Sequence, residues 1–344
     1  MFIDQVVLEE VSYPLKRPFK TALREATHTK SLYVKIICTN GIVGVGECTE
    51  TIAITGESLN SQKYIIEEIF IPQLKNKNLV EYESVLNLLN RLAPNNNSAK
   101  AAVDCAIYDC VSQFYHIPLY QLLGGSKKEL VTSVTVSLNP IDEMINQSID
   151  YIKQGFKLLK LKLGNDIQLD IERFLQLVNH VPEDTLFRID ANQGWNLKQS
   201  WNFIEKTHSA HHKIQFIEQP VHKNQLLDLK KLKDQTPLII MTDESVFDLT
   251  DAKKVLEMRA ADAINIKLMK CGGVSQAIKI ANLASAYQVP CMIGCMLETE
   301  VAIVNAMHVA FSNSNIHYVD LDAPLLINHR TNKLDIVEGK ILLK

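Results

Sequence analysis

Eight short β-rich runs alternate with helical stretches over the last two thirds of the chain, and this alternation limits the folds open to it. Successive runs that end near Asp190, Glu218 and Asp243 are 28 and 25 residues apart, a spacing that fits a strand, a helix and two loops. Alternation of this kind predicts a parallel sheet, and eight such units predict a closed barrel. The runs cover residues 131–138, 158–163, 185–190, 215–218, 238–242, 263–268, 289–296 and 317–322.

The first third of the chain has a different pattern, which predicts a separate domain of mixed strands and helices. Strand-like runs at 5–11, 31–38 and 42–47 include a hairpin turn at Asn40-Gly41. A Leu-Gly-Gly-Ser sequence at 123–126 ends the helical pattern that follows, so we place the domain boundary there. We therefore expect a first domain at 1–125, a barrel at 126–326, and a tail at 327–344 that packs back on the first domain. The helical stretches of the first domain are predicted at 61–70, 81–92 and 99–115.

Composition narrows the class of protein. The 344 residues include 36 Lys and Arg against 39 Asp and Glu, a net charge of −3, so the basic surplus of a nucleic-acid-binding protein is absent. The apolar stretches are too short for the roughly 20 residues that cross a bilayer, and the first residues lack the pattern of a secretory signal. The seven scattered cysteines form no CxxC pair. We expect a cytoplasmic protein with reduced thiols that acts on small molecules.

Three acidic residues stand at the ends of three successive predicted strands. They are Asp190, Glu218 and Asp243, and a barrel brings the carboxyl ends of its strands to one mouth. Three carboxylates together would repel one another, and a divalent ion that prefers hard oxygen ligands resolves the conflict. The sequence therefore predicts a Mg²⁺ site, with helix caps or solvated loops as the alternative for these acids.

Lysine residues form a second group at the predicted barrel mouth. Lys160 and Lys162 alternate with leucines, so both point to the same face of the second strand, the barrel interior. Lys267 lies on the sixth strand, opposite the second in a barrel of eight, so Lys162 and Lys267 can approach opposite faces of a substrate held on the metal. Buried lysines near one another and near a cation are expected to have depressed pKa values, as a general base requires. The alternative explanation of the lysines is an exposed strand with one polar side. Such a strand lies at the edge of a sheet, and a closed barrel has no edge.

The last predicted strand ends in a second acidic pair. Asp320 and Asp322 are two residues apart, a spacing that aims both carboxylates into the same mouth. The pair is suited to binding a cation. A second structural metal and a helix cap are the alternatives.

These residues together resemble the enolase superfamily in its muconate-lactonizing branch. The resemblance covers nearly the whole chain and implies a (β/α)7β modified TIM barrel, an α+β capping domain built from both ends of the chain, and one Mg²⁺ per subunit. Enzymes of this superfamily use a Lys or His base with a metal-stabilised enediolate. The motifs are Lys160-Leu-Lys162, Asp190-Ala-Asn192, Glu218-Gln-Pro220, Asp243-Glu-Ser245, and Lys267 followed by Cys271-Gly-Gly273.

Within this branch, dipeptide epimerases carry an Asp-x-Asp that holds the free α-ammonium of the substrate, and Asp320 with Asp322 matches it. The resemblance thus implies Mg²⁺-dependent epimerisation of L-Ala-D/L-Glu-type dipeptides by 1,1-proton transfer through a metal-stabilised enediolate, in murein peptide turnover. Lys162 and Lys267 would alternate as base and acid, and Lys160 would assist electrostatically. Three alternatives remain open: an Ala-Ala or apolar second residue, an o-succinylbenzoate synthase, whose substrate lacks a cation, and a non-catalytic binding protein.

Pocket residues are also implied by the resemblance. Arg24 lies in a segment, 19–24, that resembles the mobile loop closing over the barrel, and its guanidinium would grip the glutamyl carboxylate. Met296, Leu297 and Glu298 at the end of strand seven are expected in the substrate pocket, where the first two offer apolar contacts. Asn192 and Glu244 are expected beside the metal ligands. The expected partner is a small dipeptide, with neither nucleic acid nor membrane, and a homo-oligomer stays open.

Overall fold

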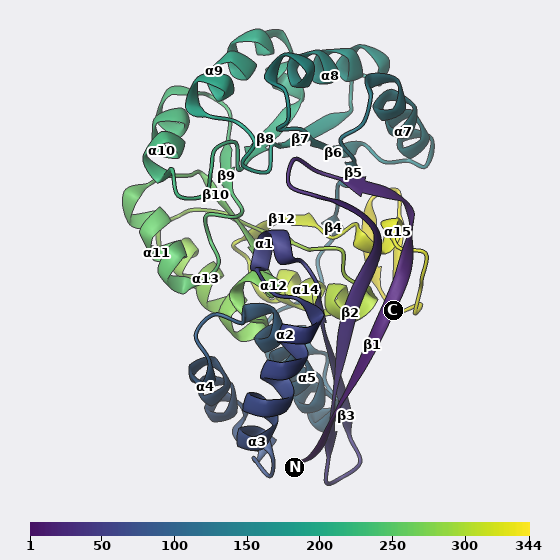
Figure 1. Ribbon diagram of the computed structural model, residues 1–344, viewed down its shortest axis with the longest axis vertical. Helices are drawn as coiled ribbons and strands as arrows, with labels where there is room; N and C mark the ends of the chain where they lie inside the picture. Colours follow the sequence, from purple (N-terminus) through teal and green to yellow (C-terminus); the bar gives the residue numbers. More distant parts are fainter.

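A parallel sheet of eight strands forms the centre of the larger part of the molecule, as the computed structural model of residues 1–344 shows (Figure 1). Neighbours in the sheet follow the chain order from β5 to β12. A parallel bridge between Thr132 and Val319 joins the two end strands, so the sheet closes into a barrel. The strands are β5 (Val134–Val136), β6 (Leu158–Lys162), β7 (Leu186–Asp190), β8 (Ile214–Glu218), β9 (Ile240–Thr242), β10 (Ala263–Lys267), β11 (Cys291–Gly294) and β12 (Ile316–Asp320).

Helices surround this barrel and follow its first seven strands (Figure 1). The last strand is followed only by the short helix α15 (Ala323–Leu326). The predicted (β/α)7β barrel is therefore confirmed. The other helices are α7 (Ile141–Lys153), α8 (Ile167–His180), α9 (Leu197–Lys206), η3 (His208–Lys213), α10 (Leu226–Gln235), α11 (Leu249–Met258), α12 (Leu268–Cys271), α13 (Val274–Ala286) and α14 (Glu300–Ser312).

Strand β6 shows how the sequence pattern becomes a filled barrel. Leu159 and Leu161 point to one side and Lys160 and Lys162 to the other, and none of the four is more than 6% exposed. The lysine side faces the interior, because Lys160 Nζ lies 2.7 Å from a carboxylate oxygen of Asp320 on β12. The leucine side then packs against the surrounding helices.

The first domain is a three-stranded antiparallel sheet with helices packed against it. Helix α5 packs on β3, where Gly44 and Gly46 leave room for its backbone, since a Cβ at either position would collide with a carbonyl of α5. The elements are β1 (Ile3–Lys20), β2 (Glu25–Cys38), β3 (Val43–Thr49), α1 (Ile52–Thr55), α2 (Leu59–Tyr64), the π-helix η1 (Ile65–Phe70), α3 (Ile71–Leu74), η2 (Leu79–Glu81), α4 (Tyr82–Leu92), α5 (Asn97–Tyr115) and α6 (Leu119–Leu122).

The β1–β2 hairpin is much longer than the predicted runs at 5–11 and 31–38. Figure 1 shows it reaching from the first domain to the barrel mouth. The extension is largely exposed and contains Pro14 and Pro18, so it lacks the buried alternation by which a strand is recognised in a sequence. The extension carries the segment 19–24 to the barrel.

The C-terminal tail contacts both parts of the molecule. Its first residues lie on β1, where Ile327 bridges Leu15 and the Asn328 amide donates to the Pro14 carbonyl at 2.9 Å. The final hairpin, β13 (Leu334–Val337) and β14 (Lys340–Leu343), pairs with β4 (Leu130–Val131) at the entry to the barrel. The division into 1–125, 126–326 and 327–344 stays a prediction.

One continuous core holds the domains together. A single cluster of 85 buried apolar residues includes side chains from β2, α5 and the barrel strands. None of the helices has both the length and the apolar character needed to cross a membrane.

Candidate active site

Three buried carboxylates meet at the carboxyl ends of the barrel strands. Asp190 ends β7, Glu218 ends β8, and Asp243 directly follows β9, so neighbouring parallel strands bring them to one edge. None is more than 1% exposed, and one oxygen from each lies within 4.8 Å of the others. The structure thus brings the predicted trio together.

The chemistry of this donor set fits Mg²⁺. Three carboxylate oxygens are hard ligands, and their mutual repulsion is visible in Glu218, whose pKa burial and the charge of Asp190 raise to about 7. Asn265 Nδ2 donates to Glu218 Oε1 at 2.7 Å and fixes the orientation of that carboxylate. The three side chains therefore form a site that a divalent cation would stabilise.

The predicted lysines surround the three carboxylates. Lys160 Nζ lies 2.7 Å from Glu218, Lys162 Nζ lies 2.6 Å from Asp190, and Lys267 Nζ lies 2.7 Å from Asp243. Strand β6, which carries the first two, and β10, which ends in Lys267, are four strands apart in either direction around the barrel. Lys162 and Lys267 also line one common pocket, together with Asn192 and Glu244.

The predicted depression of the lysine pKa values assumes a bound cation, and the carboxylates of the protein alone have the opposite effect on two of these side chains. Burial lowers the pKa of Lys160, but the charges of Asp190, Asp320 and Glu218 outweigh burial and raise the pKa well above its usual value. Burial likewise lowers the pKa of Lys267, and Asp243 more than offsets this, so the pKa is raised. The prediction counted the neighbouring amines and a cation but not the carboxylates that contact each ammonium group.

Asp320 and Asp322 line the same pocket, across from the three carboxylates. Asp320 Oδ2 accepts from Lys160 Nζ at 2.7 Å, and Asp322 Oδ2 accepts from the Thr135 amide at 2.7 Å. Burial and the neighbouring Asp320 raise the pKa of Asp322 to about 6. Asp322 directly precedes α15 but forms no side-chain capping hydrogen bond, which argues against the helix-cap alternative.

The first domain closes the pocket. Phe19, Thr21, Arg24 and Ile54 line it, and the turn at the hairpin tip is held by Thr21 Oγ1, which accepts from the Arg24 amide at 3.2 Å. The Phe19 ring lies 5.8 Å from Lys162 Nζ. No carboxylate lies within 4.0 Å of the Arg24 guanidinium, and burial lowers its pKa. Arg24 therefore presents an unpaired positive charge to the pocket.

The loop after β11 supplies an apolar wall. Met296 and Leu297 line the pocket as predicted, and Thr29 Oγ1 of β2 donates to the Leu297 carbonyl at 2.5 Å. Glu298, predicted in the same wall, is not among the residues that line this pocket. Its carboxylate is 1% exposed and accepts from the Met296 amide at 2.9 Å, and burial raises its pKa to about 8. Glu298 thus shapes the loop through this hydrogen bond, and its contact with the substrate stays a prediction.

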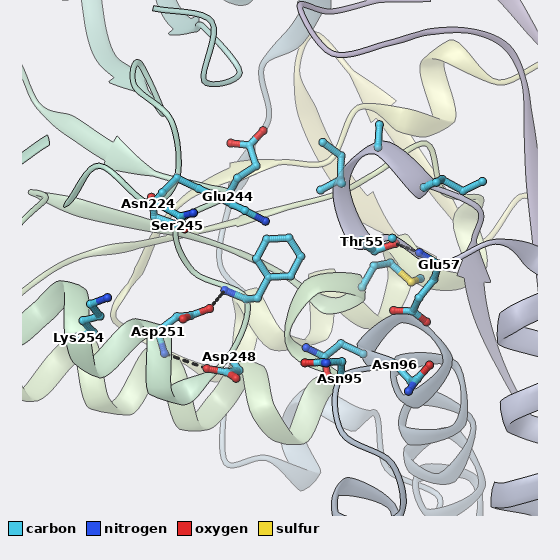
Figure 2. Close-up of a pocket in the computed structure, with 18 of the residues that line it drawn as sticks. Thr55, Glu57, Asn95, Asn96, Asn224, Glu244, Ser245, Asp248, Asp251 and Lys254 are labelled. Atoms are coloured by element: carbon cyan, nitrogen blue, oxygen red, sulfur yellow. Dashed lines mark hydrogen bonds between the residues drawn. The ribbon is translucent and has the colours of Figure 1, made fainter. Parts of the chain in front are cut away.

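A polar cleft between α1, the loop at 95–97 and the start of α11 lies next to the pocket, and Figure 2 shows its lining. Glu244 and Ile54 line both spaces. Asn192 Nδ2 donates to Glu244 Oε1 at 3.3 Å, and burial with the charge of Asp243 raises the pKa of Glu244 to about 8. Asn192 and Glu244, which the sequence predicted beside the metal ligands, therefore contact each other where the cleft meets the pocket.

Sequence reasoning missed Lys270, which is 1% exposed and whose Nζ lies 2.6 Å from Asp243 Oδ1. It sits one helical turn after Lys267, on the short helix α12. The spacing Lys-x-x-Lys was the available signal, because residues three apart share a helix face. Asn265 was also missed, although its place two residues before Lys267 on β10 puts it on the same strand face.

Comparisons with known proteins agree with this geometry. Residues 3–124 match the mandelate racemase / muconate lactonizing enzyme N-terminal domain, and residues 143–344 match the enolase C-terminal domain-like family. The L-Ala-D/L-Glu epimerase of Bacillus subtilis is 44% identical over 99% of this chain and 92% of its own length. The L-Ala-D/L-Glu epimerase of Clostridium acetobutylicum is 41% identical over 98% of this chain and 94% of its own length.

Solved structures give the same result. The substrate-liganded L-Ala-D/L-Glu epimerase from Bacillus subtilis has a TM-score of 0.98 at 42% identity and covers 100% of this chain and 97% of its own. A dipeptide epimerase from Enterococcus faecalis, complexed with Mg and L-Leu-L-Tyr, has a TM-score of 0.95 at 34% identity and covers 100% and 98%. The chain therefore belongs to the mandelate racemase and muconate lactonizing enzyme family of the enolase superfamily.

Proposed function

We propose that the protein is a Mg²⁺-dependent dipeptide epimerase that inverts the α-carbon of the second residue in L-Ala-D/L-Glu-type substrates. One observation carries the proposal: Lys162 and Lys267, from opposite strands, line one pocket whose walls also include Asp320, Asp322 and Arg24. The names of the relatives, epimerases of L-Ala-D/L-Glu and other dipeptides, support it.

The three carboxylates would hold the metal. Bound to Asp190, Glu218 and Asp243, Mg²⁺ would supply positive charge that stabilises the negative charge developing on the substrate carboxylate as the α-proton leaves. Lys160 adds a buried ammonium group that lies 2.7 Å from both Glu218 and Asp320. Three carboxylates, those of Asp190, Glu218 and Asp320, contact this ammonium group and raise its pKa, so Lys160 stays protonated and acts through its charge.

Proton transfer falls to the two opposed lysines. In one direction Lys162 accepts the α-proton from one face, and Lys267 donates a proton to the other face of the same carbon. In the reverse direction the two exchange roles. Inversion requires an amine on each face, which the placement on β6 and β10 supports.

The acidic pair distinguishes this activity from the main alternative. Asp320 and Asp322 would receive the free α-ammonium of a dipeptide, with charge-assisted hydrogen bonds. An o-succinylbenzoate synthase substrate brings no cation, so the buried negative charge would have no ligand partner. The pair therefore favours a substrate with a free amino group.

Incubation of L-Ala-L-Glu, L-Ala-D-Glu and a panel of other dipeptides in D₂O with Mg²⁺ tests the proposal. We expect α-deuterium and both epimers at the second residue, and a dehydration assay on the same protein addresses the synthase alternative. Absence of α-deuterium exchange for every dipeptide would refute the assignment.

Arg24 is expected to select an acidic second residue. Arg24→Met should lower kcat/KM for L-Ala-L-Glu by about 10- to 100-fold, because a hydrogen bond to a charged group is lost. Turnover of L-Ala-L-Leu should change little, since Phe19, Met296 and Leu297 supply apolar contacts. Kinetics on both dipeptides measure the shift, with Arg17→Gln, an exposed arginine of the same β1–β2 hairpin, as control. Equal losses on the two substrates would contradict a glutamyl preference.

Substrate binding is expected to weaken at acidic pH through Asp322. Burial and Asp320 raise its pKa to about 6, so the carboxylate is ionised above this pH and becomes neutral as the pH falls through it. Below about pH 6, kcat/KM for a dipeptide with a free amino group should therefore fall by up to about tenfold per pH unit. A pH profile of the Asp322→Asn variant should lack this inflection, and the same inflection in both proteins would assign it to another group.

A further inference from the structure

A buried arginine lies beneath the acidic pair, on the side of the barrel away from the mouth. Arg188 is on β7, two residues before Asp190, so its side chain also points into the barrel but one layer lower. It is 2% exposed, and no carboxylate lies within the 4.0 Å of an ion pair. A cation in such a place is costly unless its neighbours are arranged around it.

Arg188 contacts two regions of the barrel: β8, and the residues beside Asp320. Nη1 donates to Ser133 Oγ at 3.1 Å and to the Val319 carbonyl at 2.5 Å, and Nε donates to Gln215 Oε1 at 2.7 Å. The guanidinium carbon lies 5.1 Å from the centre of the Phe216 ring. Of these partners, Ser133 contacts the Asp320 carboxylate, and Val319 directly precedes Asp320 in β12.

Ser133 connects the arginine to the acidic pair. Its Oγ donates to Asp320 Oδ1 at 2.7 Å while it accepts from Arg188. A guanidinium can only donate, so the hydroxyl hydrogen must point away from Arg188 and toward the carboxylate. The other oxygen of Asp320 faces Lys160. Both oxygens of Asp320 are thus held by donors of fixed direction.

We propose that Arg188, acting through Ser133, is a positioning residue that orients Asp320 to receive the α-ammonium group of the substrate. The inference rests on the proposed dipeptide epimerase function and deepens it. Arg188 does not line the catalytic pocket, so its effect on the substrate must pass through Asp320.

Two substrates that differ only in the amino group test this role. L-Ala-L-Glu carries the α-ammonium, and N-propionyl-L-Glu replaces it with hydrogen. For Ser133→Ala we expect KM for L-Ala-L-Glu to rise about tenfold, the effect of one charge-assisted hydrogen bond, with kcat within about twofold. Proton exchange of N-propionyl-L-Glu, followed by NMR in D₂O, should change by less than about twofold.

Arg188→Lys provides a second variant that keeps the charge but loses the forked donors, and we expect the same selective effect. Ser148→Ala is the matched control, because Ser148 is equally buried and donates only to the Met144 carbonyl of its own helix. Equal losses on both substrates, or no loss on either in folded variants, would overturn the proposal. Failure of the wild-type protein to exchange any dipeptide would instead overturn the proposed function.

Discussion

Lys162→Ala and Lys267→Ala should each lower the rate of epimerisation by at least about 10³-fold. A positioned proton donor or acceptor contributes roughly 10²- to 10⁴-fold, and inversion needs both a base and an acid in every turnover. Lys160 cannot replace Lys162, because its ammonium group is held by Asp190, Glu218 and Asp320. The rate is measured from the approach of L-Ala-L-Glu to its epimeric mixture in saturating Mg²⁺.

Removal of either lysine also leaves a buried carboxylate with fewer partners. Loss of one member of a buried ion pair lowers the free energy of unfolding by about 3–5 kcal/mol when no other group takes its place. The variants therefore need a melting curve with Mg²⁺ beside each rate. Lys253→Ala, on the exposed side of α11, is the control and should behave as wild type. A folded Lys162→Ala or Lys267→Ala variant that keeps more than a tenth of the wild-type epimerisation rate would contradict the assignment.

Glu218→Gln should abolish Mg²⁺ binding and lower the rate of epimerisation by at least about 10³-fold. Glu218 ends the strand between those of Asp190 and Asp243, so its loss opens the centre of the ligand set. It also removes one of the three negative charges that attract the ion. Calorimetric titration with Mg²⁺ and kinetics across a Mg²⁺ series measure the two losses.

Thermal stability offers a second readout of the same substitution. Mg²⁺ should raise the melting temperature of the wild-type protein by mass action, because the ion binds the folded site. The Glu218→Gln variant should melt at the same temperature with and without Mg²⁺. Asp104→Asn, a buried carboxylate of α5 outside the site, should keep the Mg²⁺-dependent increase. An unchanged increase in Glu218→Gln would place the ion elsewhere.

The barrel and its carboxylates could be predicted because their signals are local. Strand runs recur at a regular spacing, and the residues at the carboxyl ends of parallel strands must meet at one mouth. Asp190, Glu218 and Asp243 needed only this rule, and the alternation of Lys160 and Lys162 with leucines needed only the period of a strand.

Features that depend on contacts between distant segments could not be predicted in the same way. Ser133 meets Arg188 and Asp320 only because the first and last strands of the barrel lie side by side. No pattern within one segment encodes such a contact.

The pKa values of the buried lysines also depend on contacts between distant segments. Burial and neighbouring amines could be inferred from the strand pattern, and both lower a lysine pKa. The opposing effect comes from carboxylates on other strands, such as Asp243 beside Lys267, and its size depends on distances that only the fold sets. The pKa of each lysine therefore depends on two opposing effects, burial and the nearby carboxylates, and the pattern of one strand indicates only the first.

Deuterium exchange with each pure diastereomer in the two lysine variants is the most direct test of the opposed-lysine mechanism. In D₂O with Mg²⁺, Lys267→Ala should exchange the α-proton of one L-Ala-Glu diastereomer without inversion, through Lys162. Lys162→Ala should exchange only the other diastereomer, through Lys267. Exchange of the same diastereomer by both variants would show that the two amines do not act on opposite faces.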